Sequence, residues 1–268
     1  MKVFNAFKFN VKEHWDNKKL ILQMARSEAG KQTVKTSLGI VWLYIRDFTY
    51  FFVYVIFRLL VAGSKQVEGM NAILYVILGL VPWIFISDVL NKGSTVIKAN
   101  KAVVKSIAFP VSILPTVSVI SVFIQKIFNY VVALALALLL TKGWHVNIFA
   151  VVYYSIAMIV VMIGINAIAA AFIAVSGDFQ QLYLAIVRVI MYILPVIWSF
   201  ETISNNTIKT ILRINPLCYV IEGFRHAFAG GGTFSIGYTL YFWICMFVLL
   251  LIGSYTQYKL SKFYSDLM

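Results

Sequence analysis

The stretch VIKANKAVVKSIAFPVSILP, residues 96–115, joins two long apolar segments and decides how the rest of the chain is interpreted. It is rich in lysine, with Lys98, Lys101 and Lys105 inside it and Lys92 just before it. Lysines gathered between apolar segments are typical of a loop on the cytoplasmic side of a membrane. The first half has good helix formers, and the prolines of the second half end a helix. The stretch therefore predicts a short basic helix at a cytoplasmic membrane surface.

The composition of the whole chain indicates a membrane protein. Its 268 residues are 61% hydrophobic and 12% charged, whereas a soluble domain has about 25% charged residues. The net charge of +13 would suggest a nucleic-acid partner in a soluble protein. Here the charges are confined to a few loops, which the positive-inside rule explains, so no nucleic-acid partner is expected. Cys218 and Cys245 are far apart and have no metal or redox spacing.

Six apolar segments are long enough to cross a bilayer, which takes about 20 residues. No internal repeat interrupts them, so we expect one transmembrane domain at 38–268 after a tail at 1–37. The expected fold class is an all-α polytopic membrane protein with six transmembrane helices. The segments are 39–62, 71–90, 113–140, 147–175, 182–200 and 236–257.

The distribution of cations predicts which side of the membrane each loop faces. An even number of spans places both termini on one side, and the tails and loops of that side hold 14 Lys and Arg residues against 5 on the other. That side is therefore predicted to be cytoplasmic, together with both termini. The first 37 residues hold eight Lys/Arg and three acids without an early apolar stretch, so no cleavable signal peptide is expected.

Two segments outside the spans are expected to be amphipathic. Residues 10–37 mix Trp15 and other apolar residues with many charges, which favours a helix lying in the cytoplasmic interface; a solvated tail is the alternative. In the long loop 201–235, apolar residues recur at helical spacing between Asn215-Pro216 and three glycines. This pattern predicts short re-entrant helices in the outer leaflet, before the last span.

The sequence contains no pattern of an enzyme. Its three histidines, His14, His145 and His226, are scattered over different segments, and the common hydrolase and metalloprotease motifs are absent. Residues 30–33, GKQT, lack the preceding glycine and the Ser/Thr of a phosphate-binding loop. We therefore expect no catalytic residue, no metal and no cofactor in this chain, and any ATP must be bound by a partner.

Charged and aromatic residues within the spans point to a path for a substrate. Cations inside a span usually face a bundle interior or a water-filled path, or extend to the interface. They outnumber the acids here, which suits an anionic substrate. In the first span, aromatic residues and one arginine lie within a sector of about 120° of a helix, and such rings either stack on sugars or simply pack. The residues are Trp42, Arg46, Tyr50, Tyr54 and Phe57, with Asp47, Arg58, Lys126 and Arg188 as further charges.

Four stretches occur in the order seen in a known family. They are ARSEAGKQTVKTSLGIVW (25–42), IAFPVSILPT (107–116), SGDFQQLYLAIVRVIMYILPVIW (176–198) and INPLCYVIEGFRHAF (214–228). With the predicted spans, this order resembles the polysaccharide-exporting ABC-2 type permeases over nearly the whole chain. The resemblance is greatest to wall teichoic acid exporter permeases, followed by O-antigen and capsule permeases.

The resemblance implies a transport subunit of the ABC-2 exporter fold in the bacterial cytoplasmic membrane. It implies a homodimer with two ABC ATPase subunits, which bind ATP and Mg. The cargo would be an undecaprenyl-diphosphate-linked glycopolymer, with wall teichoic acid first, O-antigen or capsular polysaccharide second, and a drug or small lipid as the remaining ABC-2 alternative. Residues 93–106 would form the coupling helix that docks on the ATPase, with Lys98, Lys101, Val103, Val104 and Lys105 as contact residues.

The resemblance also assigns expected roles along the path. Spans one and five would line it, and the short helices would gate its outer end. The substrate-path residues are Trp42, Arg46, Tyr50, Tyr54, Phe57, Lys126, Arg188 and Tyr192. The outer-gate residues are Trp198, Phe200, Pro216, Glu222, Arg225 and Phe228, and the spacing of Glu222 and Arg225 would allow them to pair. The lipid-headgroup entry residues are Lys18, Lys19, Arg26, Lys31 and Lys35.

Two functions from other classes remain open at this point. A membrane-bound acyl- or glycosyltransferase would need an acid/base constellation, and none is evident. An ion-driven flippase would need paired intramembrane carboxylates, whereas Asp47 is the carboxylate clearly inside a predicted span.

Overall fold

The computed structural model describes residues 2–31, 39, 41–104, 109–141, 146–229, 231 and 234–267. Lys35 and Lys105 lie outside the described residues, as do the side chains of Lys101 and Val103. The described residues are almost entirely helical, with one isolated bridge between Val67 and Met70. The main helices are α1 (Lys2–Asp16), α2 (Lys18–Lys31), α3 (Val41–Ala62), α4 (Ala72–Lys92), α7 (Leu114–Leu140), α8 (Ile148–Val175), α9 (Gly177–Ile193), α10 (Asn206–Arg213), α11 (Pro216–Phe228) and α12 (Ile236–Leu267).

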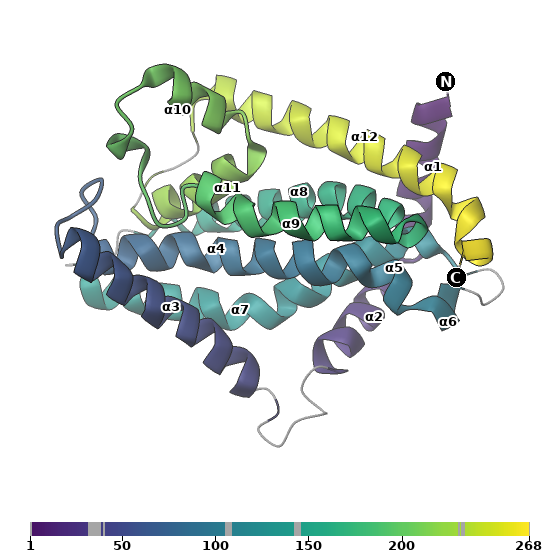
Figure 1. Ribbon diagram of the computed structural model, residues 1–268, viewed down its shortest axis with the longest axis horizontal. Helices are drawn as coiled ribbons and strands as arrows, with labels where there is room; N and C mark the ends of the chain where they lie inside the picture. Colours follow the sequence, from purple (N-terminus) through teal and green to yellow (C-terminus); the bar gives the residue numbers. More distant parts are fainter. Residues whose placement is uncertain are drawn as a thin grey trace.

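The core is built around α4 and α8. A helix that is apolar on all sides must be buried on all sides, and 83% of the most apolar part of α4 is buried. α4 packs against α3, α7, α8 and α11, while α8 packs against α12 along most of its length. Gly164 and Gly253 allow this last pair to approach closely, as small residues do between membrane helices. Figure 1 shows α4 in the middle of the bundle, with α12 along one side.

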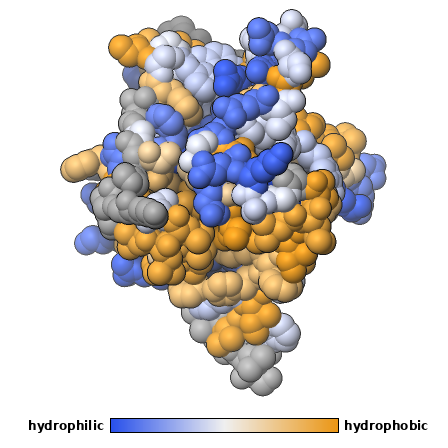
Figure 2. Space-filling view, turned by 90° about the vertical axis from the view of Figure 1, so that its left-hand side faces the viewer, coloured by the Kyte–Doolittle hydropathy of each residue, from blue (hydrophilic) through white to orange (hydrophobic). Residues whose placement is uncertain are grey.

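The two ends of the bundle carry different elements. Both chain termini lie at the same end as α5 (Val96–Ala99) and α6 (Lys101–Val104), whereas α10 lies at the opposite end (Figure 1). Figure 2 shows that opposite end, where hydrophilic residues gather over the centre and hydrophobic residues form a broad band below them. This polarity fits a helical bundle whose polar end meets water and whose flanks meet lipid.

Four helices are long and apolar enough to cross a membrane, which supports a multi-pass membrane protein. Among the described residues they are Ala72–Ala99, Val111–Leu140, Ile148–Val175 and Ile236–Ser261. α3 carries Arg46, Asp47 and Arg58, and α9 has 17 residues, so these two helices fall outside that group. The count of six spans therefore stays a prediction.

The expected limits of span five, 182–200, are wrong. α9 begins at Gly177 because the Ser176 side chain caps it, accepting a hydrogen bond from the Phe179 amide at 3.2 Å. It ends at Ile193 because Leu194 precedes Pro195 and takes an extended conformation. The chain leaves the helix seven residues early, and the Pro195 and Val196 carbonyls then accept hydrogen bonds from Arg225 of α11.

The expected single helix at 93–106 is also wrong. A short 3₁₀ turn, Gly93–Thr95, continues directly from α4, α5 follows it, and Asn100 separates α5 from α6. Val96 and Ile97 are buried against Ala170, Ala171, Ala174 and Tyr264, so they are not available to a groove on a partner. Val104 belongs to the same buried cluster. The apolar face of this segment serves the fold of the chain itself.

The N-terminal amphipathic segment begins earlier than expected and has two parts. α1 and α2 meet at Asn17, whose side chain donates a hydrogen bond to the Glu13 carbonyl at 2.8 Å. α1 packs across α12, and α2 packs along α7. The helix at 216–228, by contrast, begins and ends as expected, since Asn215 caps it and Pro216 occupies its first turn.

Candidate functional site

The predicted aromatic face of α3 meets the end of α9. Tyr50 and Tyr54 are stacked with ring centroids 6.2 Å apart, and the Tyr54 hydroxyl lies 3.3 Å from the Met191 sulfur on α9. Trp42, Phe57 and Tyr192 are exposed, Tyr192 to 71%. A cavity of about 340 Å³ lies beside them, lined by Tyr54, Phe57, Arg58, Val61, Val67, Ile197, Trp198, Ser199 and Thr202. The exposed rings of α3 and Tyr192 of α9, which approach each other where Tyr54 contacts Met191, make up the aromatic surface of α3 and α9; Trp42 lies at the other end of α3.

The charged residues of the predicted path separate into two groups. Arg188 is exposed on α9, one helical turn from Tyr192. Lys126 on α7 is 1% exposed and is therefore not a contact for substrate in this conformation, contrary to the prediction. Its ammonium lies 2.7 Å from an Asp47 carboxylate oxygen on α3 and 3.0 Å from an Asp88 oxygen on α4.

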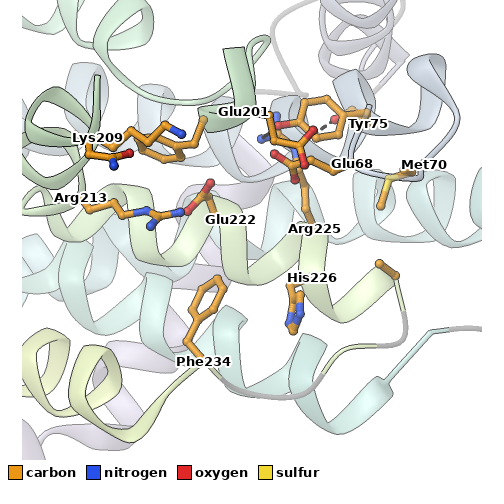
Figure 3. Close-up of a pocket in the computed structure, with 13 residues that line it drawn as sticks. Glu68, Met70, Tyr75, Glu201, Lys209, Arg213, Glu222, Arg225, His226 and Phe234 are labelled. Carbon is orange, nitrogen blue, oxygen red and sulfur yellow. Dashed lines mark hydrogen bonds between the residues drawn. The ribbon is translucent and has the colours of Figure 1, made fainter. Parts of the chain in front are cut away.

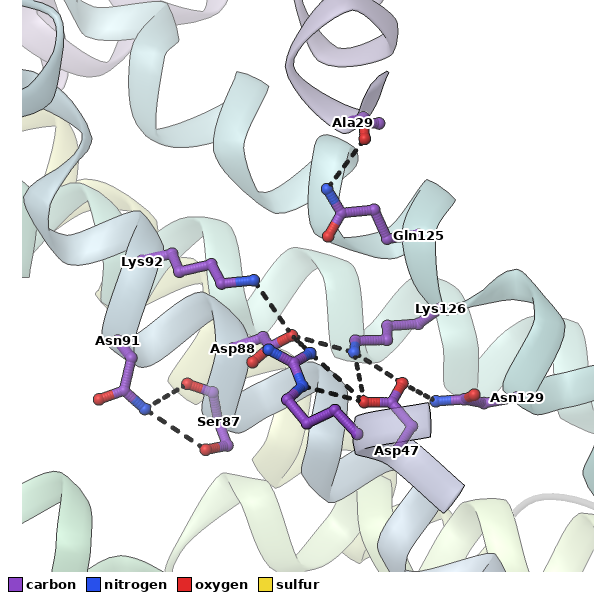
Figure 4. A network of polar contacts seen from close by, with 10 residues as sticks. Ala29, Asp47, Ser87, Asp88, Asn91, Lys92, Gln125, Lys126 and Asn129 are labelled. Carbon is purple, nitrogen blue, oxygen red and sulfur yellow. Dashed lines mark hydrogen bonds and ion pairs between the residues drawn. The ribbon is translucent and has the colours of Figure 1, made fainter. Parts of the chain in front are cut away.

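Lys126 is the centre of an ion network that joins three helices. Arg46 contacts Asp88 at 2.8 Å and Asp47 at 3.3 Å, while Lys92 lies 3.5 Å from Asp88. The Asn129 amide donates a further hydrogen bond to Asp47 at 2.9 Å. Figure 4 shows these side chains converging between α3, α4 and α7. Three cations face two carboxylates, and the two most exposed cations, Arg46 and Lys92, lie at the edge.

Sequence reasoning missed Asp88 and Asn129 as partners of this network. A signal was present, because Asp88 and Lys92 are spaced i,i+4 at the end of an apolar segment. Two spans with a carboxylate and a third with a lysine indicate pairing within a bundle. Asp47 and Asp88 therefore act as structural counter-ions of the buried Lys126.

Arg225 links α11 to α4 and to the segment that follows α9. The side chain is 4% exposed and donates to the Tyr75 carbonyl at 3.1 Å, the Tyr75 hydroxyl at 3.0 Å and the Pro195 carbonyl at 2.6 Å. It also donates to the Val196 carbonyl, and its guanidinium lies 3.9 Å from the Tyr75 ring centroid. The expected pairing with Glu222 is wrong, because Arg225 turns toward α4 and the segment after α9. Neither side chain reaches the other within ion-pair distance.

A polar cavity of about 570 Å³ lies beside Arg225, at the end of the molecule formed by α10 and α11. Figure 3 shows Glu68 and Glu201 close to Arg225 and Tyr75, and Arg213 reaching toward Glu222. Burial raises the pKa of Glu222 to about 7, although Arg213 and Arg225 favour its ionised form. Of the other predicted gate residues, Phe200 is buried below Arg213, Trp198 packs edge-on against Phe200, Phe228 is in the core, and Pro216 opens α11.

The cations predicted for lipid headgroups and for the ATPase lie toward the other end. Lys18, Lys19, Arg26 and Lys31 are exposed on α2, where Lys31 pairs with Glu28 at 2.9 Å. Lys98 on α5 donates to the Gln180 side-chain oxygen at 3.2 Å, which links α5 to the start of α9. Within the described residues, no group of three or more His, Cys, Asp or Glu side chains is arranged to hold a metal ion.

Comparison with known proteins identifies the family. Residues 29–229 match the family described as ABC-2 type transporter. The chain is similar to an O-antigen export system permease protein RfbA of Myxococcus xanthus, with 24% identity over 225 residues, covering 81% of this chain and 83% of the relative. It is also similar to the RfbA permease of Klebsiella pneumoniae, with 24% identity over 225 residues, covering 80% and 81% of the two chains.

These matches confirm the family predicted from the four sequence stretches. The matched region runs from α2 to the end of α11 and contains α3, the ion network, α9 and the Arg225 contacts. Since the match covers more than half of the chain and the helices suit a membrane, the chain belongs to the ABC-2 type transporter family of multi-pass membrane proteins.

Proposed function

We propose that this chain is the permease subunit of an ATP-driven exporter of a lipid-linked cell-surface polysaccharide. Both relatives described above are named as O-antigen export permeases, which favours a polysaccharide of that kind as cargo. Wall teichoic acid, which the sequence resemblance places first, becomes the alternative polymer. The carrier would be undecaprenyl diphosphate, and a bacterial cytoplasmic membrane with both termini inside would be the location.

The observation that carries the proposal is the open aromatic surface shared by α3 and α9. Trp42, Tyr50, Phe57 and Tyr192 are each more than two fifths exposed, and Tyr54 contacts Met191 where the two helices approach each other. Rings of this kind stack on the apolar faces of sugars, and tyrosine hydroxyls add hydrogen bonds. A second copy of the chain, facing this surface across a two-fold axis, would close it into a path with many weak contacts.

The cargo and the partners are tested by purifying the tagged chain in mild detergent from its own cells. We expect two copies of an ABC ATPase subunit to accompany two copies of the chain, with a glycan on a polyprenyl diphosphate. A polyol-phosphate polymer in place of a saccharide would assign the wall teichoic acid alternative. If the chain is purified together with an ATPase and a small lipid or drug in place of a glycan, the polysaccharide proposal is overturned. The chain would then be an ABC-2 permease of another class.

The aromatic surface is tested by removing two of its rings. Replacing both Tyr50 and Tyr54 by alanine should lower polymer export about tenfold, since each ring contact is worth about 0.5–1.5 kcal/mol. The matched control, in which both are phenylalanine, keeps the rings and should export at close to the wild-type rate. Export is measured in proteoliposomes as polymer reaching the far side per ATP hydrolysed. Equal export by the alanine and phenylalanine variants would contradict a stacking role.

The segment 93–104 is proposed to pass the movement of the ATPase to α9. Its buried apolar residues fix it to the ends of α8 and α12, and Lys98 contacts Gln180 at the start of α9. A movement of the segment is therefore carried to α9, one wall of the proposed path. Lys101, Val103 and Lys105 remain proposed contacts with the partner.

Two single variants separate this internal link from a direct contact with the ATPase. Lys98→Met and Gln180→Met remove the same hydrogen bond from its two sides, and both should raise the number of ATP molecules hydrolysed per polymer exported. If Lys98 instead acts by touching the ATPase, Gln180→Met should behave like the wild type. Measuring ATPase activity and export on the same proteoliposomes distinguishes the two outcomes.

A further inference from the structure

A cavity of about 420 Å³ lies on the part of the molecule away from the proposed path. It lies between α1 with the first residue of α2 on one side, and Ser112, the start of α7, α8 and α12 on the other. None of its lining residues comes from α3, α4 or α9. Its volume lies in the range of small-molecule sites.

The walls of this cavity present little unsatisfied polarity. Its apolar lining includes Phe7, Ile163 and Leu250. Several polar side chains of the walls are bonded within the protein, among them His14, which bonds to the Asn10 carbonyl at 2.7 Å and to the Thr116 hydroxyl at 2.9 Å. Gln257 likewise donates to the Ala167 carbonyl at 2.7 Å. The interior is therefore suited to hydrocarbon.

The mouth of the cavity has the opposite character. Lys18 lines it and holds its ammonium 4.3 Å from the centroid of the Trp15 ring, which is itself 70% exposed. Within the described residues Lys18 has no carboxylate at ion-pair distance, and no carboxylate lines the cavity. A tryptophan beside a lysine marks the headgroup level of a membrane. Lys8 and Lys12 line a neighbouring hollow on α1 and add to the positive charge.

We propose that this cavity binds an anionic phospholipid of the leaflet that α1 contacts. Part of one acyl chain lies between α1, α8 and α12, and the phosphate lies beside Lys18 at the mouth. Anionic charge is expected because Lys18 has no carboxylate at ion-pair distance in the part of the chain that the structure describes. Lys18 is also one of the residues predicted for headgroup entry of the cargo, but the cavity shares no lining residue with the aromatic surface of α3 and α9, so we assign it to a resident lipid. A bound lipid there would hold α1 against α12.

The test uses the full chain, stripped of lipid in detergent, and native mass spectrometry with phosphatidylglycerol and phosphatidylcholine of the same acyl chains. The wild type should bind phosphatidylglycerol about fivefold more tightly, because one lysine near anionic headgroups contributes about 1 kcal/mol. Lys18→Gln should abolish this preference. Lys19→Gln is the matched control, because Lys19 is the next residue, is exposed and does not line the cavity, and it should keep the preference.

A second variant tests the position of the acyl chain. Leu250→Trp fills the cavity and should weaken both lipids equally, with no change in the preference between them. Equal binding of the two lipids by the wild type would overturn the proposal, as would loss of the preference in Lys19→Gln. Displacement of phosphatidylglycerol by a polyprenyl diphosphate in the wild type but not in Leu250→Trp would show that the cavity belongs to the cargo instead.

Discussion

Replacing Gly79 by alanine is expected to destabilise the protein by about 3 kcal/mol or more, although alanine is the better helix former by about 1 kcal/mol. A Cβ atom at this position in α4 would overlap the Val196 carbonyl oxygen and the Arg225 guanidinium. Arg225 has nowhere to move, because it is buried and bonded to Tyr75 and Pro195 on its other sides. The substitution therefore disturbs a buried cation together with the segment that it holds.

Stability is measured by thermal unfolding of the purified protein in detergent. The readout is the fraction of the protein that remains monodisperse after heating. Gly237→Ala is the matched control, because it is also a helical glycine and a Cβ there meets no atom within 4 Å. It should leave the midpoint unchanged or raise it slightly. A Gly79→Ala protein as stable as Gly237→Ala would show that Arg225 and the segment after α9 are held together loosely.

Replacing Lys126 by methionine is expected to cost about 3–5 kcal/mol, because it removes the central cation of a buried network. Methionine has a similar shape, so the loss is mainly electrostatic: Asp47, which is 2% exposed, keeps only Arg46 and Asn129 as partners. In the double variant Asp47→Asn/Lys126→Met the buried carboxylate is also gone. We therefore expect the double variant to be more stable than Lys126→Met alone, by a coupling of about 1–3 kcal/mol.

The control for this pair is Lys92→Gln, which removes a cation at the edge of the same network, 3.5 Å from Asp88 and about one third exposed. Its effect should be about 1 kcal/mol or less, since a partly exposed ion pair contributes little. The stabilities are compared by thermal unfolding, and export by the Lys126→Met/Asp47→Asn protein is measured as well. If that protein exports normally, the network serves the fold alone. If Lys126→Met proves as stable as the wild type but fails to export, that result would support the original prediction that Lys126 contacts the substrate.

The sequence predicted the apolar helices because their cause is local. A run of about 20 apolar residues in a chain that is 61% hydrophobic has no stable place in water, whatever its neighbours are. The same holds for the start of α11, where Asn215 and Pro216 act on their own turn. The order of four short stretches was enough to predict the family, which the comparison confirms.

Partners far apart in the chain could not be predicted in this way. Lys126 looked like a contact for an anionic substrate until the packing of α3 and α4 placed Asp47 and Asp88 beside it. Arg225 was expected to pair with Glu222, three residues away, yet it donates to carbonyls 29 and 30 residues distant, in the segment that follows the end of α9 at Ile193. Val104 was expected to contact the ATPase and is buried in a cluster with residues of α8 and α12.

What the sequence determined alone is therefore the long apolar helices, the helix at 216–228 and the membrane as solvent; the ends of α9 at Ser176 and before Pro195 were missed. What the tertiary structure decided is which charges are neutralised and which surfaces stay open. The physical reason is range: helix propensity and hydropathy act over a few residues, whereas the state of a buried charge depends on the nearest opposite charge in space. That charge is supplied by a helix whose position only the packed bundle fixes.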